Sequence, residues 1–213
     1  MSFVRINYDQ WERKEFLKYF QNTAIYMTAL IDISTLYKEI KQRGLRLYPA
    51  LVYCAAKVIN QHPEFRYAYD DQQNVGIWDT LHPYYTVPRK NNHMLFSMKC
   101  TQFTFDFSAF YADFVRDFAL AERCGRLLCD ESLPKNICGI SIVPGLQYSS
   151  FSFGGSPKMD FTPFTLFGKF EQQGESVRLP VSGEFSHAVN DGAHISLFFQ
   201  ELEKTANQLF SNL

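Results

Sequence analysis

The chain has 213 residues, 46% of them hydrophobic and 20% charged, a composition typical of one globular domain that spans residues 1–213. Its formal charge of −1 leaves no basic surplus for binding nucleic acid or an anionic membrane. No stretch approaches the roughly 18 apolar residues of a membrane span, and the first residues lack a signal-peptide pattern, so we expect a cytoplasmic protein.

Helix and strand patterns alternate irregularly along the chain. Capping residues, apolar periodicity and terminating Gly or Pro residues predict helices over 9–20, 34–43, 49–61, 107–128 and 193–210. Short apolar or alternating runs predict strands over 65–69, 75–78, 84–87, 94–99, 139–143, 146–153, 163–171 and 176–187. Because these elements follow no βαβ rhythm, we expect an α+β fold, a mixed β-sheet sandwich with helices packed on one face. The 21 Phe and 12 Tyr residues favour extensive sheet, an aromatic-lined pocket, or both.

The cysteines do not indicate a metal site. Cys54, Cys100, Cys124, Cys129 and Cys138 form an odd set without the C-x-x-C spacing of structural zinc. The pair Cys124 and Cys129 lies at a predicted helix end with no histidine beside it. We expect reduced, mostly buried thiols and no metal.

One short motif has the residues for proton transfer. His187-Ala-Val-Asn-Asp191-Gly192 places an imidazole and a carboxylate four positions apart, at the end of an apolar strand pattern. An imidazole can remove a proton near neutral pH, the carboxylate can hold the surrounding loop, and Gly192 permits a tight turn. A plain strand-to-helix turn with an Asp near the helix N-terminus fits the same six residues.

The other histidines are weaker candidates. His62 and His82 each precede a proline, which indicates surface turns, and His93 lies in a polar, solvated loop. His194 begins the last predicted helix, where its side chain should turn away from the strand end.

Other polar motifs have simpler structural explanations. Gly154-Gly155 predicts a hairpin turn, since no glycine-rich phosphate-binding pattern follows it. The serines at 149, 150 and 152 lack the glycine-flanked turn of a hydrolase nucleophile. The acid pairs Asp70-Asp71 and Asp130-Glu131 are most simply solvated turn residues. One base candidate without a covalent nucleophile suits direct transfer, in which the base activates a bound acceptor and a nearby donor stabilises the oxyanion.

Several motifs, taken in order, resemble the chloramphenicol acetyltransferase family over roughly residues 3 to 210. The family signature His-His-Ala-Val-Cys-Asp-Gly corresponds here to Ser186-His187-Ala-Val-Asn190-Asp191-Gly192. Four further stretches resemble the family in order and spacing: Trp11-Glu-Arg-Lys-Glu15, Tyr48-Pro-Ala-Leu-Val52, Val75-Gly-Ile-Trp-Asp79 and Ile140-Ser-Ile-Val-Pro144.

The resemblance implies acetyl transfer from acetyl-coenzyme A, a co-substrate, to a hydroxyl, without an acyl-enzyme and without a permanently bound cofactor. It implies that His187 is the general base, with its other ring nitrogen held by a backbone carbonyl, and that Ser141 stabilises the oxyanion. Asp191 is implied to pair with Arg13 and shape the loop. The resemblance also implies a homotrimer, with a sheet extended across subunits and each site between two of them.

The departures from the family lie where they would alter the acceptor. The paired histidine of the family is replaced here by Ser186, its cysteine by Asn190, and a tyrosine near the end of the first helix by Phe20. A threonine that orders a water is replaced by Leu166, and an asparagine two positions before Ser141 by Gly139. The segment between the first helix and Leu30 is shorter than in the family. We therefore expect a redrawn acceptor pocket that includes Phe20, Phe151 and Leu166.

Two other functions stay open at this stage. The chain could be an H-x-x-x-D-G acyltransferase for another alcohol, an amine or a dihydrolipoyl thiol, although it lacks lipoyl-type and linker segments. It could also be a catalytically silent ligand-binding relative that has kept the fold. Chloramphenicol is the first acceptor to test.

Overall fold

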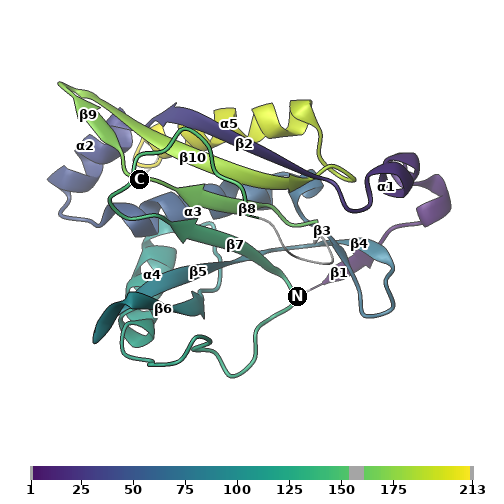
Figure 1. Ribbon diagram of the computed structural model, residues 1–213, viewed down its shortest axis with the longest axis horizontal. Coiled ribbons are helices and arrows are strands. Elements are labelled where there is room, and N and C mark those ends of the chain that lie inside the picture. Colours follow the sequence, from purple (N-terminus) through teal and green to yellow (C-terminus); the bar gives the residue numbers. More distant parts are fainter. Residues whose placement is uncertain (1, 154–160, 212–213) are drawn as a thin grey trace.

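The computed structural model describes residues 2–153 and 161–211 and shows a mixed β-sheet with helices packed against one face (Figure 1). The main sheet has seven strands in the order β2-β10-β8-β7-β5-β6, with β9 beside β10, and a smaller sheet has the order β1-β4-β3. The helices are α1 (Lys14–Phe20), α2 (Ser34–Gln42), α3 (Leu47–Gln61), α4 (Phe107–Ala121) and α5 (Gly192–Asn207), with 3-10 turns η1 (Tyr8–Gln10) and η2 (Pro63–Phe65). The strands are β1 (Phe3–Arg5), β2 (Ala24–Asp32), β3 (Tyr67–Tyr69), β4 (Val75–Trp78), β5 (His82–Arg89), β6 (Asn92–Cys100), β7 (Ile137–Ile142), β8 (Phe164–Phe167), β9 (Glu171–Gln173) and β10 (Ser176–Ser186). The predicted α+β class with a mixed sheet is confirmed.

Strand β10 organises the main sheet. It pairs antiparallel with β2 from Arg178 opposite Asp32 to Ser186 opposite Ala24, and it pairs antiparallel with β8 on its other side. Strand β7 then lies parallel to both β8 and β5. Residues opposite one another in adjacent strands share a face, so this register fixes which side chains lie side by side across the sheet.

The core lies between the sheet and the helices. Helix α3 is apolar almost all round and nearly entirely buried, as expected of a helix covered on both sides. The rings of Phe65, Phe185 and Phe198 pack together, with centroids 5.3–6.2 Å apart, and join η2, β10 and α5. This packing fixes the end of β10, the position from which the H-x-x-x-D-G loop departs.

Two predicted helices differ from the structure. The helix predicted over 9–20 is broken at Trp11, whose backbone is extended and whose ring is buried against Leu17 and Val189. The helix predicted over 107–128 ends at Ala121 because the next segment pairs with β6 through a hydrogen bond from Met98 N to Leu127 O. Among the described residues, no helix is both long and apolar enough to cross a bilayer.

The strand predictions missed one edge strand of the main sheet. Strand β2 was not predicted, because its exposed residues show no clear alternation and its position is set by β10. The strand predicted over 146–153 is absent; Tyr148 instead donates a hydrogen bond to the carbonyl of Leu166, which holds this segment beside β8. The strand predicted over 163–171 is shorter, and the predicted turn at Gly154-Gly155 lies outside the described residues.

Two residues predicted to be solvated at the surface are less exposed than expected. His82 is buried in β5, where its Nδ1 accepts a hydrogen bond from Phe103 N at 3.0 Å, and burial lowers its pKa. Asp130 forms an ion pair with Lys99 and accepts a hydrogen bond from Cys100 N. Both predictions treated a local turn pattern as exposed, whereas long-range pairing buries His82 and leaves Asp130 only partly exposed. His93 is exposed, as predicted.

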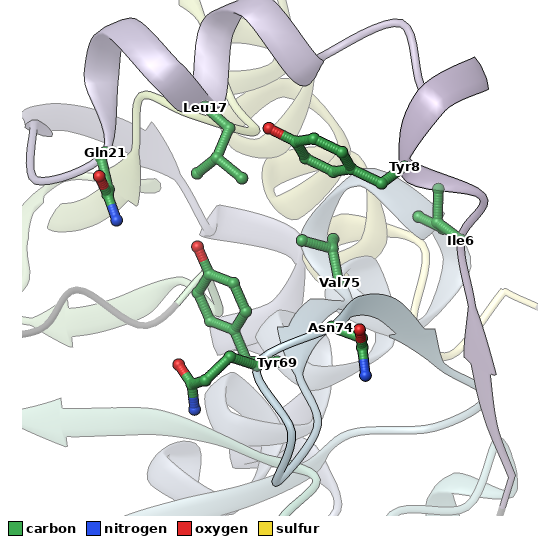
Figure 2. A pocket seen from close by; sticks show the side chains of 8 residues that line it. Ile6, Tyr8, Leu17, Gln21, Tyr69, Asn74 and Val75 are labelled. Carbon is green, nitrogen blue, oxygen red and sulfur yellow. The ribbon is translucent and has the colours of Figure 1, made fainter.

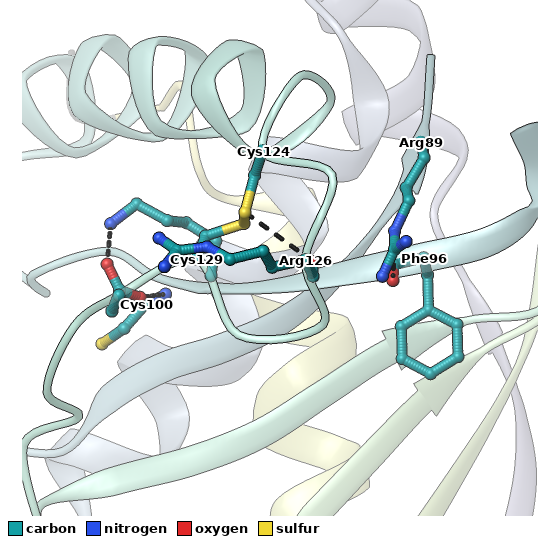
Figure 3. The surroundings of a disulfide bond; sticks show 8 residues. Arg89, Phe96, Cys100, Cys124, Arg126 and Cys129 are labelled. Carbon is teal, nitrogen blue, oxygen red and sulfur yellow. Dashed lines mark hydrogen bonds and ion pairs between the residues drawn. A yellow bond between two sulfur atoms is a disulfide. The ribbon is translucent and has the colours of Figure 1, made fainter. Parts of the chain in front are cut away.

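The prediction of reduced thiols is wrong for one pair. Cys124 and Cys129 are joined by a disulfide across a turn that contains Gly125 at φ +70°, with Cα atoms 5.8 Å apart (Figure 3). Cys54, Cys100 and Cys138 are free, and Cys54 and Cys138 are buried. The disulfide closes the segment that leads from α4 back to β6.

The disulfide predicts a specific thiol count. Unfolded without reductant, the protein should alkylate at three cysteines, and at five after reduction, because only a disulfide withholds two of them. Mass spectrometry after iodoacetamide treatment measures this. The Cys124→Ser variant is the matched control, since it should release Cys129 without reductant. Five alkylated cysteines before reduction of the original protein would contradict the pairing.

Candidate functional site

His187 follows β10 directly and is held on three sides. Its backbone N–H donates to the carbonyl of Thr23 at 2.9 Å, and its ring stacks on Phe20 with centroids 3.9 Å apart. Its Nδ1 lies 3.2 Å from the carbonyl oxygen of Asn190. A carbonyl oxygen only accepts, so this contact places the proton on Nδ1 and leaves the lone pair on Nε2. The neutral ring is therefore oriented to take up a proton at Nε2.

Arg13 holds the loop that carries His187. Its guanidinium donates to the carbonyl of Ala188 at 3.0 Å, to the Asp191 carboxylate at 3.2 Å, and more distantly to the carbonyl of His187. Asn190 adds a hydrogen bond from its side-chain amide to the carbonyl of Glu64. These bonds tie the loop to α1 and η2, so its backbone geometry depends on residues distant in the sequence.

Asp191 also caps helix α5. Its carboxylate accepts from Ala193 N at 3.1 Å, and the His194 ring folds back onto it. Burial opposes ionisation of Asp191, but His194, Arg13 and the Ala193 N–H together outweigh that effect and lower its pKa. Asp191 thus fits both interpretations of the motif, the helix-capping turn and the loop held by a carboxylate, because it caps α5 and also pairs with Arg13.

Ser141 lies elsewhere on the sheet, in a row of residues aligned across four strands. Register places Ser141 of β7 opposite Leu166 of β8, Leu166 opposite Ser182 of β10, and Ser182 opposite Thr28 of β2. Their chain neighbours, such as Ile140, Phe167 and Val181, are buried in the core that the helices cover, so the row lies on the opposite face. The hydroxyls of Thr86 and Ser141 are 2.9 Å apart at one end of this row.

A single chain does not bring His187 and Ser141 together. Ser182, which shares the row of Ser141, precedes His187 by five residues, or about 16 Å along β10 at about 3.3 Å per residue. Ser141 is also two strands away from β10, or about 10 Å across the sheet. The two groups are too far apart to act on one bond within one chain.

The predicted acceptor residues divide between these two positions. Phe20 lies against His187, whereas Leu166 belongs to the Ser141 row and is 3% exposed. Phe151 is half-buried in the segment beyond β7, with its ring near those of Tyr148 and Phe153. Sequence reasoning missed Thr86 and Tyr148, because strand pairing and loop packing place them there and no local pattern signals either contact.

A pocket of about 470 Å³ lies between α1 and the β3–β4 hairpin (Figure 2). Its lining includes Tyr8, Leu17, Gln21 and Tyr69, and contains neither His187 nor Ser141. Across the described ranges, no cluster of three or more His, Cys, Asp or Glu side chains could hold a metal ion. The contact of its Nδ1 with the Asn190 carbonyl makes His187 a candidate base with a fixed tautomer.

Comparisons with known proteins identify the family of this chain. A family model described as chloramphenicol acetyltransferase matches residues 1–203. Chloramphenicol acetyltransferases of Clostridium perfringens and Campylobacter coli are 34% and 35% identical to this chain; the first alignment covers 97% of this chain and 96% of the relative, the second 98% and 100%.

Solved structures share the fold at lower identity. A chloramphenicol acetyltransferase structure matches with a TM-score of 0.81 at 22% identity, covering 95% of this chain and 99% of the other. The dihydrolipoamide acetyltransferase of Azotobacter vinelandii matches with a TM-score of 0.68 at 14% identity, covering 92% and 86%. With the family model and the curated relatives spanning nearly its whole length, the chain belongs to the chloramphenicol acetyltransferase family of acyltransferases.

Proposed function

We propose that this chain transfers an acetyl group from acetyl-coenzyme A to a hydroxyl of chloramphenicol or a related small molecule, with His187 as general base. The observation that carries the proposal is the contact between His187 Nδ1 and the Asn190 carbonyl, which leaves Nε2 as the free basic nitrogen. Family membership supports the choice of donor and acceptor. The same reasoning favours a cytoplasmic enzyme, where acetyl-coenzyme A is supplied.

The mechanism we propose is a direct transfer. Nε2 of His187 removes the acceptor hydroxyl proton as the oxygen attacks the thioester carbonyl. The tetrahedral intermediate carries a negative oxygen, to which the Ser141 hydroxyl donates a hydrogen bond. Collapse of the intermediate breaks the carbon–sulfur bond, and the departing thiolate takes the proton from the imidazolium. No acyl-enzyme is formed.

We propose that each site is completed by a second subunit of a homotrimer. His187 and Ser141 lie too far apart in one chain, and both are partly accessible to solvent. His187 of one subunit can therefore face the row of residues that contains Ser141 on another subunit. Large apolar side chains remain exposed on the edge strands, among them Met27 and Leu30 on β2 and Met94 and Phe96 on β6. Such patches are common at subunit interfaces.

The acceptor pocket differs from the family pattern beside Ser141. Leu166 presents an apolar side chain where the resemblance implies a water-ordering threonine. At Gly139 a Cβ would lie 2.7 Å from the Phe164 ring, so this ring occupies the space of a larger residue. With no threonine hydroxyl at position 166 and the Phe164 ring filling the space beside Gly139, the surroundings of Ser141 are less polar than the family pattern implies, so an alcohol other than chloramphenicol is the second candidate.

Mixing two inactive variants tests the shared site. His187→Ala should abolish transfer, and Ser141→Ala should lower kcat by about 10²–10³. If they are refolded together in equal amounts, random trimers should recover on the order of a quarter of the original activity, because about one site in four receives an intact residue from each subunit. Thiol release from acetyl-coenzyme A with chloramphenicol as acceptor measures the activity.

Each outcome of the mixing experiment bears on a different part of the proposal. The matched control is a mixture of His187→Ala with unaltered protein, which should retain about half of the activity for independent sites. Failure of complementation with this control intact would refute a site shared between subunits. No thiol release by the unaltered protein would remove chloramphenicol as acceptor, and failure with alcohols, amines and thiols together would favour the silent relative.

The lowered pKa of Asp191 predicts a pH-dependent contribution to stability. Its folded pKa lies below the unfolded value of about 3.9, so the ionised group stabilises the fold above that pH and loses this effect as pH falls through the folded pKa. Asp191→Asn keeps a capping side chain and should lower the free energy of unfolding by about 1 kcal/mol at pH 7.

Urea unfolding between pH 7 and the acid range measures this difference. The difference in the free energy of unfolding between the original protein and Asp191→Asn should shrink below about pH 4. In an Arg13→Gln background the gap should be smaller but still depend on pH, because His194 and the Ala193 N–H still interact with the carboxylate. A difference in unfolding free energy that stays constant over this pH range would contradict the stabilising effect of ionised Asp191.

A further inference from the structure

The contact between Thr86 and Ser141 extends the site by one residue. Thr86 lies on β5, next to β7, and the register of Tyr85 opposite Ile140 continues to place Thr86 opposite Ser141. Their side-chain oxygens are 2.9 Å apart, a hydrogen bond in which either could be the donor. The irregularity in β5 lies further along, between Pro88 and Arg89, so the pairing at Thr86 is undisturbed.

The direction of this hydrogen bond decides what Ser141 can do. A hydroxyl has one proton to donate and two lone pairs that accept. If Ser141 donates its proton to Thr86, it must break that bond before it can stabilise an oxyanion. If Thr86 donates to Ser141, the Ser141 proton is free to point into the site. Oxyanion stabilisation is most effective when the donor is oriented in advance.

The proposed mechanism requires the second direction. In the tetrahedral intermediate the negative oxygen accepts the single Ser141 proton, so Ser141 can then only accept from Thr86. The Thr86 hydroxyl, 2.9 Å from that of Ser141, is placed to donate this hydrogen bond. A Ser141 oxygen that accepts from Thr86 also becomes a stronger donor toward the oxyanion.

We propose that Thr86 is a positioning residue that orients the Ser141 hydroxyl toward the oxyanion of the tetrahedral intermediate. This inference rests on the proposed role of Ser141 as oxyanion donor. Thr86 suits the task because a β-branched side chain on a strand has few χ1 choices, so its hydroxyl is held in place. It acts through Ser141 and need not touch either substrate.

A double-mutant cycle tests the coupling in the full-length oligomer. Thr86→Val removes the hydroxyl at nearly constant volume and should lower kcat about tenfold, the rate equivalent of one hydrogen bond, with little change in KM. Thr86→Ser retains the hydroxyl and should restore kcat to within about threefold of the original. In a Ser141→Ala background, Thr86→Val should cause no further loss, because the group it orients is already absent.

Thr104→Val is the matched control. Thr104 lies before α4, outside the row that contains Ser141, and its hydroxyl accepts a hydrogen bond from Asp106 N at 3.3 Å. This variant should leave kcat unchanged. If Thr86→Val fails to assemble, Thr86→Ala removes the same hydroxyl without the branched side chain and carries the same expectation for kcat.

The outcomes separate this inference from the proposed function. An unchanged kcat in Ser141→Ala would refute the oxyanion role of Ser141, and the positioning role of Thr86 with it. A loss in Ser141→Ala together with an equal, independent loss from Thr86→Val in both backgrounds would refute only the role of Thr86. A rise in KM without a fall in kcat in Thr86→Val would also refute it, because that pattern reports ground-state binding.

Discussion

The hydrogen bond between His187 Nδ1 and the Asn190 carbonyl is the constraint from which the proposed chemistry follows. A histidine on a flexible loop would exchange tautomers and orientations, and only one arrangement presents a basic Nε2. The short loop supplies its own acceptor, and the Phe20 ring limits rotation of the imidazole. Arg13 and the capping role of Asp191 then hold the carbonyl in place. The carboxylate thus contributes through geometry and needs no part in proton transfer.

The same sheet that fixes His187 also separates it from Ser141. The register of β10 with β8, and of β8 with β7, leaves no freedom to shorten that distance, because a slip by one residue would turn every core side chain to the opposite face. His187, the proposed base, and Ser141, the proposed oxyanion donor, are therefore each held rigidly, and neither is complete without the other. Assembly of identical subunits is a simple way to join two such halves, since it repeats both on every chain.

Prediction from the sequence succeeded where information is local or where several motifs can be read together. Apolar periodicity located most helices and strands, and the ordered motifs identified the family and the pairing of Arg13 with Asp191. Prediction failed where contacts between residues distant in the sequence determine the local structure. Strand β2 has no clear alternation of its own, His82 is buried by pairing beyond its turn, and the Cys124–Cys129 disulfide forms only because the chain turns back toward β6. The contact between Thr86 and Ser141 belongs to the same class, because strand order alone creates it.

The apolar side chain of Leu166 makes the hydrogen bond between Thr86 and Ser141 more important for the proposed mechanism. Where a threonine could order a water molecule beside the reacting carbon, Leu166 offers no hydrogen-bonding group and is nearly completely buried. In the proposed mechanism, oxyanion stabilisation on this face then depends on the single proton of Ser141. A site with two donors tolerates a misdirected hydroxyl better than a site with one. The proposed role of Thr86 in orienting the Ser141 hydroxyl therefore matters more with leucine at position 166 than it would with threonine there.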